Sequence, residues 1–180
     1  SMAVFLDRYG SEDKCEAALV AARDLLVEAG PPAVTLKAVA ERIGRTHANV
    51  LHHFGSAAGL QQALTDFLAA GMLDSIALAL QAAKRGEVTP RAAVDRVFDA
   101  FALEGGGPLV GWTALSRNGA MLDPLVHAIH QLVHDACAEG QGDAPAAMQR
   151  DTLVLVLLAL GDWLLGEPLS LALDLPRDAA

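Results

Sequence analysis

The sequence predicts an all-helical protein. Of its 180 residues, 53% are hydrophobic but only 4% are aromatic, with Ala and Leu the commonest. Apolar residues recur every three or four positions, as in helices with one buried face, and clear apolar–polar alternation typical of strands is rare. Ser, Thr or Pro stands just ahead of several such stretches, where these residues cap or begin helices. A chain of this length can bury a real core in one or two domains.

The first helix is expected to begin at Ser11. A capping hydroxyl followed by Glu12 and Asp13 favours a helix start, because acidic side chains are stabilised near the positive end of the helix dipole. An apolar stripe continues as far as Ala29. The Gly-Pro-Pro at residues 30–32 ends the helix, since proline restricts both itself and the residue before it.

Residues 35–60 predict two short helices and the start of a third. Thr35, Thr46 and Ser56 each precede an apolar-periodic stretch and can cap it through the side-chain hydroxyl. Gly44 stands where the first helix must end, because glycine reaches the left-handed conformation without steric cost. This layout is typical of a helix-turn-helix.

The second short helix is predicted to bury Val50, Phe54 and, at the margin of the same side, Leu51. Its other side is expected to be polar and uncharged apart from histidine. Asn and His on such a face suit insertion in the major groove of DNA. An ordinary capped helix pair in an all-α domain is the alternative on spacing alone. The residues expected to contact DNA are Thr35, Lys37, Arg45, Thr46, His47, Ala48, Asn49, His52 and His53.

These positions resemble the TetR/AcrR family of bacterial transcription regulators. The shared pattern is a Thr-Leu helix start, a glycine turn, a Thr cap, a short helix ending in His-His-Phe at residues 52–54, then Ser and a leucine-containing helix. The helix at residues 15–30 is also similar to the family's first helix, so the likeness covers about the first third of the chain. Two positions depart from the family: Leu51 replaces the usual Tyr, and Gly55 stands where Lys or Pro is common, which removes phosphate contacts.

The resemblance implies a DNA-binding domain at residues 11–70 and a helical effector-binding and dimerisation domain at residues 71–180. It also implies a homodimeric repressor that a small molecule releases from a palindromic operator in double-stranded DNA. The alternative is a small-molecule or partner-binding protein with the same fold that has lost tight DNA binding. The sequence contains none of the common catalytic motifs, so neither an enzyme nor a cofactor is expected.

The net charge of −9 does not exclude DNA binding, because the acidic residues lie mainly downstream. Residues 61–180 hold seven Lys or Arg and fifteen Asp or Glu, a net −8. Residues 35–60 hold three Lys or Arg and one Glu, a net +2. DNA affinity depends on local phosphate neutralisation, so the local charge is the relevant one, although it is small.

Further helices are predicted downstream of Ser56. The first runs to about Ala83, with a polar turn at residues 84–87, and the next begins at Pro90 with Thr89 as its cap. Residues 105–108, Gly-Gly-Gly-Pro, predict a break. The remaining helices are expected at residues 109–116, 122–139, 146–165 and 168–175.

Large side chains in the second half are candidates for an effector pocket, with plain core packing as the alternative. They include Phe98, Phe101, Trp112 and Met121, of which Trp112 is the best candidate because it follows the glycine-rich break. With no buried charge pair evident, an uncharged or weakly polar ligand is expected.

The last two predicted helices are expected to form the dimer interface. Residues 153–160 are apolar almost all round, which is more than one core needs from an outer helix. Two such helix pairs can form a four-helix bundle about a two-fold axis. The predicted interface residues are Leu153, Val156, Leu157, Leu160, Leu169 and Leu173.

Other features favour plain interpretations. Asp123, His127, His130 and His134 share one helical face, but that face lies about 120° from the apolar one at roughly 100° per residue, so we expect a solvated flank and no metal. The two cysteines lie far apart in the sequence and lack the spacing of a metal site. We therefore expect small buried thiols in a reducing compartment and no disulfide. There is no secretory signal, and the longest apolar run is too short to cross a bilayer, so a cytoplasmic protein is expected.

Overall fold

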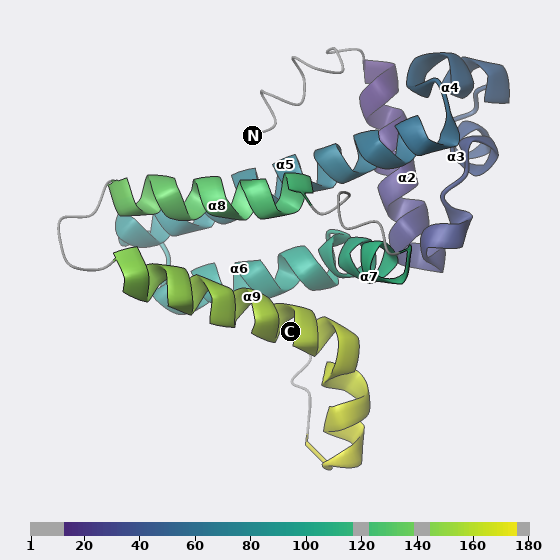
Figure 1. The fold of residues 1–180 in the computed structure, drawn as a ribbon. Coiled ribbons are helices and arrows are strands. Elements are labelled where there is room, and N and C mark those ends of the chain that lie inside the picture. The colour runs from purple at the N-terminus through teal and green to yellow at the C-terminus, as the bar shows by residue number, and fades with distance from the viewer. Residues whose placement is uncertain (1–12, 117–122, 139–144, 176–180) are drawn as a thin grey trace.

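The computed structural model describes residues 13–116, 123–138 and 145–175, which form helices and no strand (Figure 1). The predicted all-α class is therefore confirmed. The predicted cap Ser11 lies outside the described residues. The helices are α2 (Asp13–Ala29), the 3-10 helix η1 (Pro31–Ala33), α3 (Leu36–Arg42), α4 (His47–Phe54), α5 (Ala57–Lys84), α6 (Pro90–Ala102), α7 (Gly106–Ser116), α8 (Asp123–Ala138) and α9 (Pro145–Ala172).

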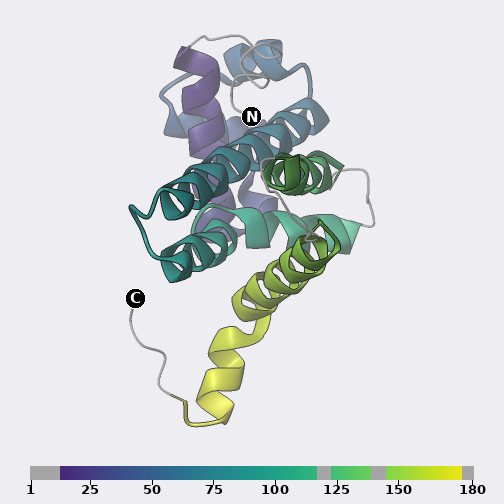
Figure 2. The same cartoon turned by 90° about the vertical axis from the view of Figure 1, so that its left-hand side faces the viewer.

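Helix α5 runs through both halves of the molecule and contributes to two hydrophobic cores (Figures 1 and 2). The first core joins its N-terminal part to α2, α3 and α4, and includes Leu109 from α7. The second core joins its C-terminal part to α6, α8 and α9. The change from one core to the other falls between Leu68 and Met72. A single rigid helix thus connects the two parts.

The four predicted hydroxyl caps are confirmed. Thr35, Thr46, Ser56 and Thr89 each accept a hydrogen bond from the backbone N–H three residues later, at 3.1, 3.3, 3.0 and 3.2 Å. Each bond satisfies one of the N–H groups that have no partner within the first helical turn. Local sequence therefore fixes where these helices begin.

The glycine-rich break before α7 is shorter than predicted. Helix α7 begins at Gly106, three residues earlier than expected, and only Gly105 adopts a left-handed conformation, with φ +94°. Pro108 fits the first turn because its missing N–H would have no helical partner there. Gly107 permits close packing instead, since a Cβ at this position would lie 2.3 Å from the Trp163 ring.

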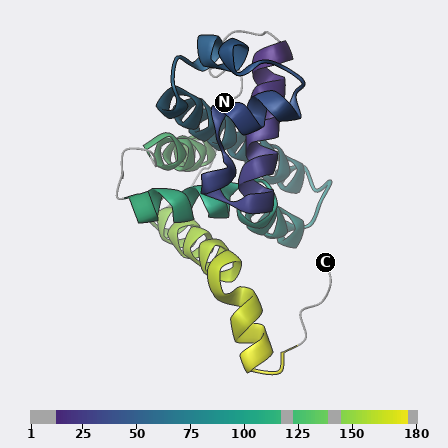
Figure 3. The same cartoon turned by 90° about the vertical axis from the view of Figure 1, so that its right-hand side faces the viewer.

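The prediction of two separate C-terminal helices was wrong. Helix α9 continues from Pro145 to Ala172 with Pro168 inside it. A proline in a helix interior removes one hydrogen bond and crowds the carbonyl four residues earlier, which bends a helix without necessarily ending it. The C-terminal part of α9 accordingly turns away from its first part and projects from the body of the molecule (Figures 1 and 3).

Two helices are long and apolar enough to cross a membrane by length and composition alone, namely α5 and the stretch Gln149–Ala172 of α9. Helix α5 passes this test because it is a core helix, with 44% of its most apolar window buried. Only 6% of the corresponding window of α9 is buried among the described residues. Helix α9 therefore presents an apolar stripe, which continues into the turn just after the helix and includes Leu153, Val154, Leu157, Leu158, Leu164, Leu165, Leu169, Leu171 and Leu173.

Candidate nucleic-acid interface and internal cavity

Helices α3 and α4 are fixed to the body by their apolar sides. Leu36 and Val39 of α3 and Val50 of α4 are buried in the first core, and Phe54 packs against it. Gly44, with φ +65°, makes the turn between the two helices. The left-handed conformation lets the chain reverse after α3 and begin α4 only a few residues later.

The structure exposes all nine residues that the sequence analysis assigned to DNA contact. On α4, at about 100° per residue, Ala48 and His52 lie almost opposite the buried Val50, and Asn49 lies beside them. The face is polar and free of acidic residues. An eight-residue helix with this exposed side suits insertion in a major groove.

The two sides of α4 face different neighbours. Asn49 and His53 border a hollow that α4 forms with α2, and Arg45 lines the same hollow. His47 borders another hollow, which extends across η1 to Trp112 of α7. Trp112, which was predicted to line an effector pocket, therefore lies in the same hollow as His47 at the start of α4.

The cations of this region are partly neutralised. Two nitrogens of Arg42 lie 2.9 and 2.7 Å from the two carboxylate oxygens of Glu28 on α2. The hydrogen bonds from Arg42 lower the pKa of the Glu28 carboxyl and raise the pKa of the Arg42 guanidinium. Lys37 Nζ lies 3.8 Å from a carboxylate oxygen of Glu41. Fewer unpaired cations are therefore available to DNA phosphates than the net charge of residues 35–60 indicates.

The N-terminus of α4 offers backbone donors to an anion. Thr46 Oγ1 accepts the N–H of Asn49, while the N–H groups of His47 and Ala48 lie in the first turn, where helices supply no acceptor. A DNA phosphate can bind such groups and is favoured by the helix dipole. This position would fix the register of α4 on the duplex.

A capped pair of short helices, held by a third helix and exposing the polar face of the second, defines a helix-turn-helix DNA-binding unit. Residues 18–64, about a quarter of the chain, match the family model described as bacterial regulatory proteins, tetR family. No curated protein sequence matches the chain. The matched segment spans most of α2, all of α3 and α4, and the start of α5. Residues 18–64 thus form a helix-turn-helix similar to the DNA-binding domain of tetR-family transcription regulators.

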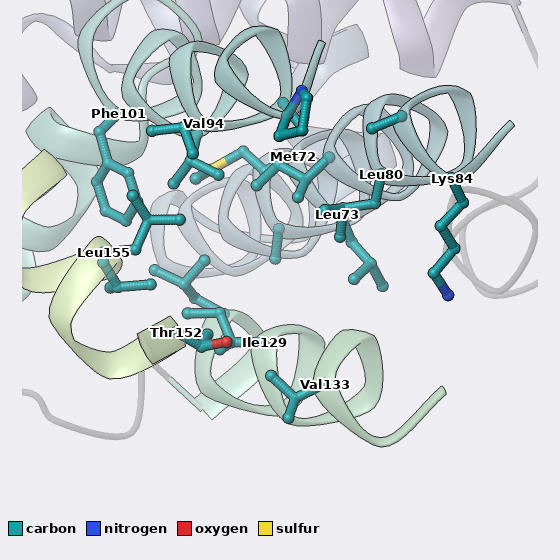
Figure 4. A pocket seen from close by; sticks show the side chains of 18 residues that line it. Met72, Leu73, Leu80, Lys84, Val94, Phe101, Ile129, Val133, Thr152 and Leu155 are labelled. Carbon is teal, nitrogen blue, oxygen red and sulfur yellow. The ribbon is translucent and has the colours of Figure 1, made fainter. Parts of the chain in front are cut away.

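A cavity of about 420 Å³ lies in the other half of the molecule, among α5, α6, α8 and α9 (Figure 4). Of the predicted pocket residues, Phe101 lines this cavity and Phe98 packs against the surrounding core. Trp112 lies elsewhere, in the hollow beside η1, and Met121 is outside the described residues. All but two of the 18 lining side chains are apolar, and the exceptions are Lys84 and Thr152. Sequence analysis missed Lys84 because it falls at the edge of a polar turn.

The six predicted interface residues divide between two sides of α9. Four are exposed apolar side chains, namely Leu153, Leu157, Leu169 and Leu173. The other two point inward: Val156 lines the cavity and Leu160 packs against the second core. The exposed four suit contact with another molecule, whereas Val156 and Leu160 serve the protein's own interior.

The histidine-rich face of α8 is exposed along its length. Asp123, His127, His130 and His134 are all exposed, and His134 Nδ1 lies 3.5 Å from an Asp135 carboxylate oxygen. No group of three side chains suited to holding a metal occurs in the described part of the chain. This face is described most simply as a solvated one.

Proposed function

We propose that the protein is a dimeric repressor that leaves its operator when a small molecule enters the cavity among α5, α6, α8 and α9. The observation that carries this proposal is that one helix serves both sites. Helix α5 packs against α4 near its start and lines the cavity from Ala69 to Lys84. A ligand that moves α5 or its neighbours can therefore change the position of the DNA-reading unit.

The proposed DNA contacts follow from the face of α4. Asn49, beside Ala48 and His52, would read base edges, where the amide of asparagine can pair with adenine. Thr46 and the first-turn amides would hold a phosphate, and Lys37 and Arg45 would neutralise neighbouring ones. In this proposal, residues 11–70 form the DNA-binding domain, and residues 71–180 form the domain that binds the effector and dimerises.

Packing between α9 and α7 supports a route between the two sites. Leu155 and Val156 of α9 line the cavity, and Trp163 on the same helix lies against Gly107 and Gly111 of α7. Trp112 of α7 then packs against the first core beside η1. Movement of α9 on ligand binding would pass through these contacts to the start of α3.

The exposed stripe on α9 supports a homodimer. An apolar surface of this extent is unusual on a monomer in water and marks an interaction site. A two-fold symmetric dimer would present two copies of α4 to half-sites of a palindromic operator, one helical turn or more apart. A cytoplasmic location follows from this function.

A second candidate function is a ligand or partner sensor with little affinity for DNA. The pairing of Arg42 with Glu28 favours it, because this pair removes one of the few cations near the recognition unit. Leu51, 37% exposed on α4, adds an apolar side chain where a hydrogen-bond donor would help hold a phosphate.

Selection of bound fragments from genomic DNA at low salt tests the two candidates. A regulator should enrich a small set of fragments that share an inverted repeat, and the enrichment should disappear for a variant with Asn49 and Thr46 both changed to alanine. Failure to retain any duplex at low salt would reject the repressor and leave the sensor. Binding without an inverted repeat would reject the dimeric arrangement.

A further inference from the structure

The side chains that line the cavity among α5, α6, α8 and α9 limit the chemical class of ligand that it can bind. Apart from Thr152 and Lys84, every lining side chain is apolar. A ligand with several polar groups would leave them without hydrogen-bond partners here, which costs free energy. Thr152 does not alter this conclusion, because one hydroxyl cannot pair with several polar groups of a ligand. The part of the ligand inside the cavity must therefore be hydrocarbon.

The shape of the cavity is elongated. Its lining residues on α5 lie on one face and extend from Ala69 to Lys84, a distance of roughly 22 Å at 1.5 Å per residue. Residues from Pro90 to Phe101 of α6 line the same space along the neighbouring helix. Figure 4 shows Phe101 and Lys84 at opposite ends, with the aliphatic side chains between them. A long, narrow ligand fits this space better than a compact one.

The two ends differ in polarity. Phe101 is 2% exposed, so the end of the cavity that it lines lies in the protein interior. Lys84 is exposed and lies at the opposite end, where α5 finishes (Figure 4). The two arginines that follow in the sequence, Arg85 and Arg91, do not line the cavity. Among the described residues that line the cavity, the ammonium group of Lys84 is the positive charge.

From these observations we infer that the cavity binds a single-chain amphiphile, with its hydrocarbon tail directed toward Phe101 and a carboxylate head at Lys84. The inference deepens the proposed function and rests on it for the role of the ligand as an effector. The head would lie beside the exposed Lys84 side chain, so its charge would not be buried at high cost. The tail supplies the affinity through burial of apolar surface. The ligand is thus charged at one end, unlike the uncharged or weakly polar one expected from the sequence.

The first experiment is a titration of the purified full chain with straight-chain carboxylates of increasing length, below the concentrations at which they form micelles. Burial of each methylene contributes about 0.8 kcal/mol, so affinity should rise roughly fourfold per added carbon until the tail reaches the end lined by Phe101, and then level off. Primary alcohols and amines of equal length should bind more weakly than the carboxylates. Equal affinity for all three heads, or no dependence on chain length, would overturn the inference.

Substitutions at the polar end of the cavity test the role of Lys84. Lys84→Met keeps a long apolar side chain and removes the charge, and because Lys84 is exposed the variant should fold normally. Carboxylate affinity should fall roughly three- to tenfold, while alcohol affinity should stay the same. Arg91→Met is the matched control, since Arg91 is an exposed cation that does not line the cavity. An equal loss in both variants would indicate general charge attraction and overturn the specific contact.

Substitutions along α5 locate the tail. Ile76→Trp adds bulk to a lining position, so it should weaken long carboxylates more than short ones. Leu78→Trp is its control, because Leu78 is on the same helix, is 65% exposed and does not line the cavity. If the two variants bind alike, the chains bind outside the cavity, for example on the apolar stripe of α9, and the inference fails.

Operator binding separates this inference from the proposed function. Release of DNA by long carboxylates, but not by alcohols of equal length at the same concentration, would support both. If DNA binds but no carboxylate does, the ligand class is wrong and the regulator stands. If carboxylates bind with the predicted pattern and no DNA is bound, the ligand class stands and the repressor fails.

Discussion

The indole ring of Trp163 on α9 lies against the backbone of Gly107 on α7, so closely that a methyl group on Gly107 would lie 2.3 Å from the ring. Gly111, one turn further along α7, would place a Cβ 3.2 Å from the same indole. Two glycines at this spacing form a flat strip on α7 that the large aromatic side chain covers. The contact joins the helix that lines the cavity to the helix that reaches the DNA-binding half.

Gly107→Ala should therefore destabilise the fold. The added methyl group must displace the Trp163 ring, and overpacking of this kind costs about 1–3 kcal/mol. The higher helix propensity of alanine offsets up to about 1 kcal/mol of this cost. We expect a net loss of about 1–2 kcal/mol in the free energy of unfolding, measured by denaturant titration.

Gly161→Ala is the matched control for this change. Gly161 lies within α9, and a Cβ there would meet no atom within 4 Å. This variant should gain up to about 1 kcal/mol from helix propensity alone. Equal stability of the two variants would show that Trp163 adjusts freely and that the α7–α9 contact transmits little.

The starts of the helices were predictable from sequence because they depend on local chemistry. Thr35, Thr46, Ser56 and Thr89 cap helices by bonding to an N–H three residues away, so the pattern is visible in a short window. The Gly44 turn has the same local origin. The exposed face of α4 followed in turn, since helix geometry and the burial of Val50 determine it.

Features that depend on distant residues were not predictable. Arg42 finds its partner Glu28 on another helix, and nothing in residues 35–60 indicates that the pair forms. Trp112 was assigned to a pocket from its size and its neighbours in sequence, but its position is set by packing of α7 against η1. At Pro168 the local sequence was misleading. Proline disfavours a helix interior and so indicated a helix end, but α9 continues through it to Ala172.

Glu28→Gln should strengthen DNA binding. The substitution removes the carboxylate that neutralises Arg42, which frees the guanidinium for a phosphate. The slope of log affinity against log salt should steepen by about 0.9 for each Arg42 that reaches a phosphate. Fluorescence anisotropy with a labelled duplex at several salt concentrations measures this slope.

Glu87→Gln is the control for Glu28→Gln. Glu87 forms a similar exposed ion pair with Arg85, at the opposite end of α5 from α4. Its loss should leave the salt slope unchanged. A steeper slope in both variants would show that total charge, and not the release of Arg42, controls the affinity.

The pKa shift of Glu28 gives this ion pair a defined pH dependence. Because the folded-state pKa of the carboxyl is lowered, the pair stabilises the fold at pH values above the ordinary range of a glutamate, near 4.5. That contribution is lost as the pH falls through the lowered value. Both side chains are solvent-exposed, so wild type and Glu28→Gln should differ only slightly at neutral pH and converge in acid, as followed by thermal unfolding.

Leu157→Glu should dissociate the proposed dimer without unfolding the chain. Leu157 is 57% exposed on the stripe of α9, so a carboxylate there stays in water in the monomer but would be buried in a dimer. Light scattering at micromolar concentration should report a dimer for the wild type and a monomer for the variant. Leu78→Glu, at a position 65% exposed on α5, should remain dimeric.

Val156→Glu distinguishes the two sides of α9. Val156 lines the cavity, so a charge there enters an apolar interior and should destabilise the fold itself. A wild type that is monomeric, or a Leu157→Glu variant that stays dimeric, would contradict the assignment of this stripe to the interface.

Asn49→Ala should weaken binding to the selected operator by about 1–3 kcal/mol, if its amide pairs with one base edge in each half-site. Asn49 is exposed on α4, beside Ala48 and His52, and it donates its own backbone N–H to Thr46, so the variant keeps the helix cap. Affinity for unrelated duplexes should change little, because these complexes depend on phosphate contacts. Lys37→Ala provides the contrast and should weaken all sequences about equally. A uniform loss for Asn49→Ala across operator and unrelated DNA would identify Asn49 as a phosphate contact, and base reading would then pass to His52 and its neighbours.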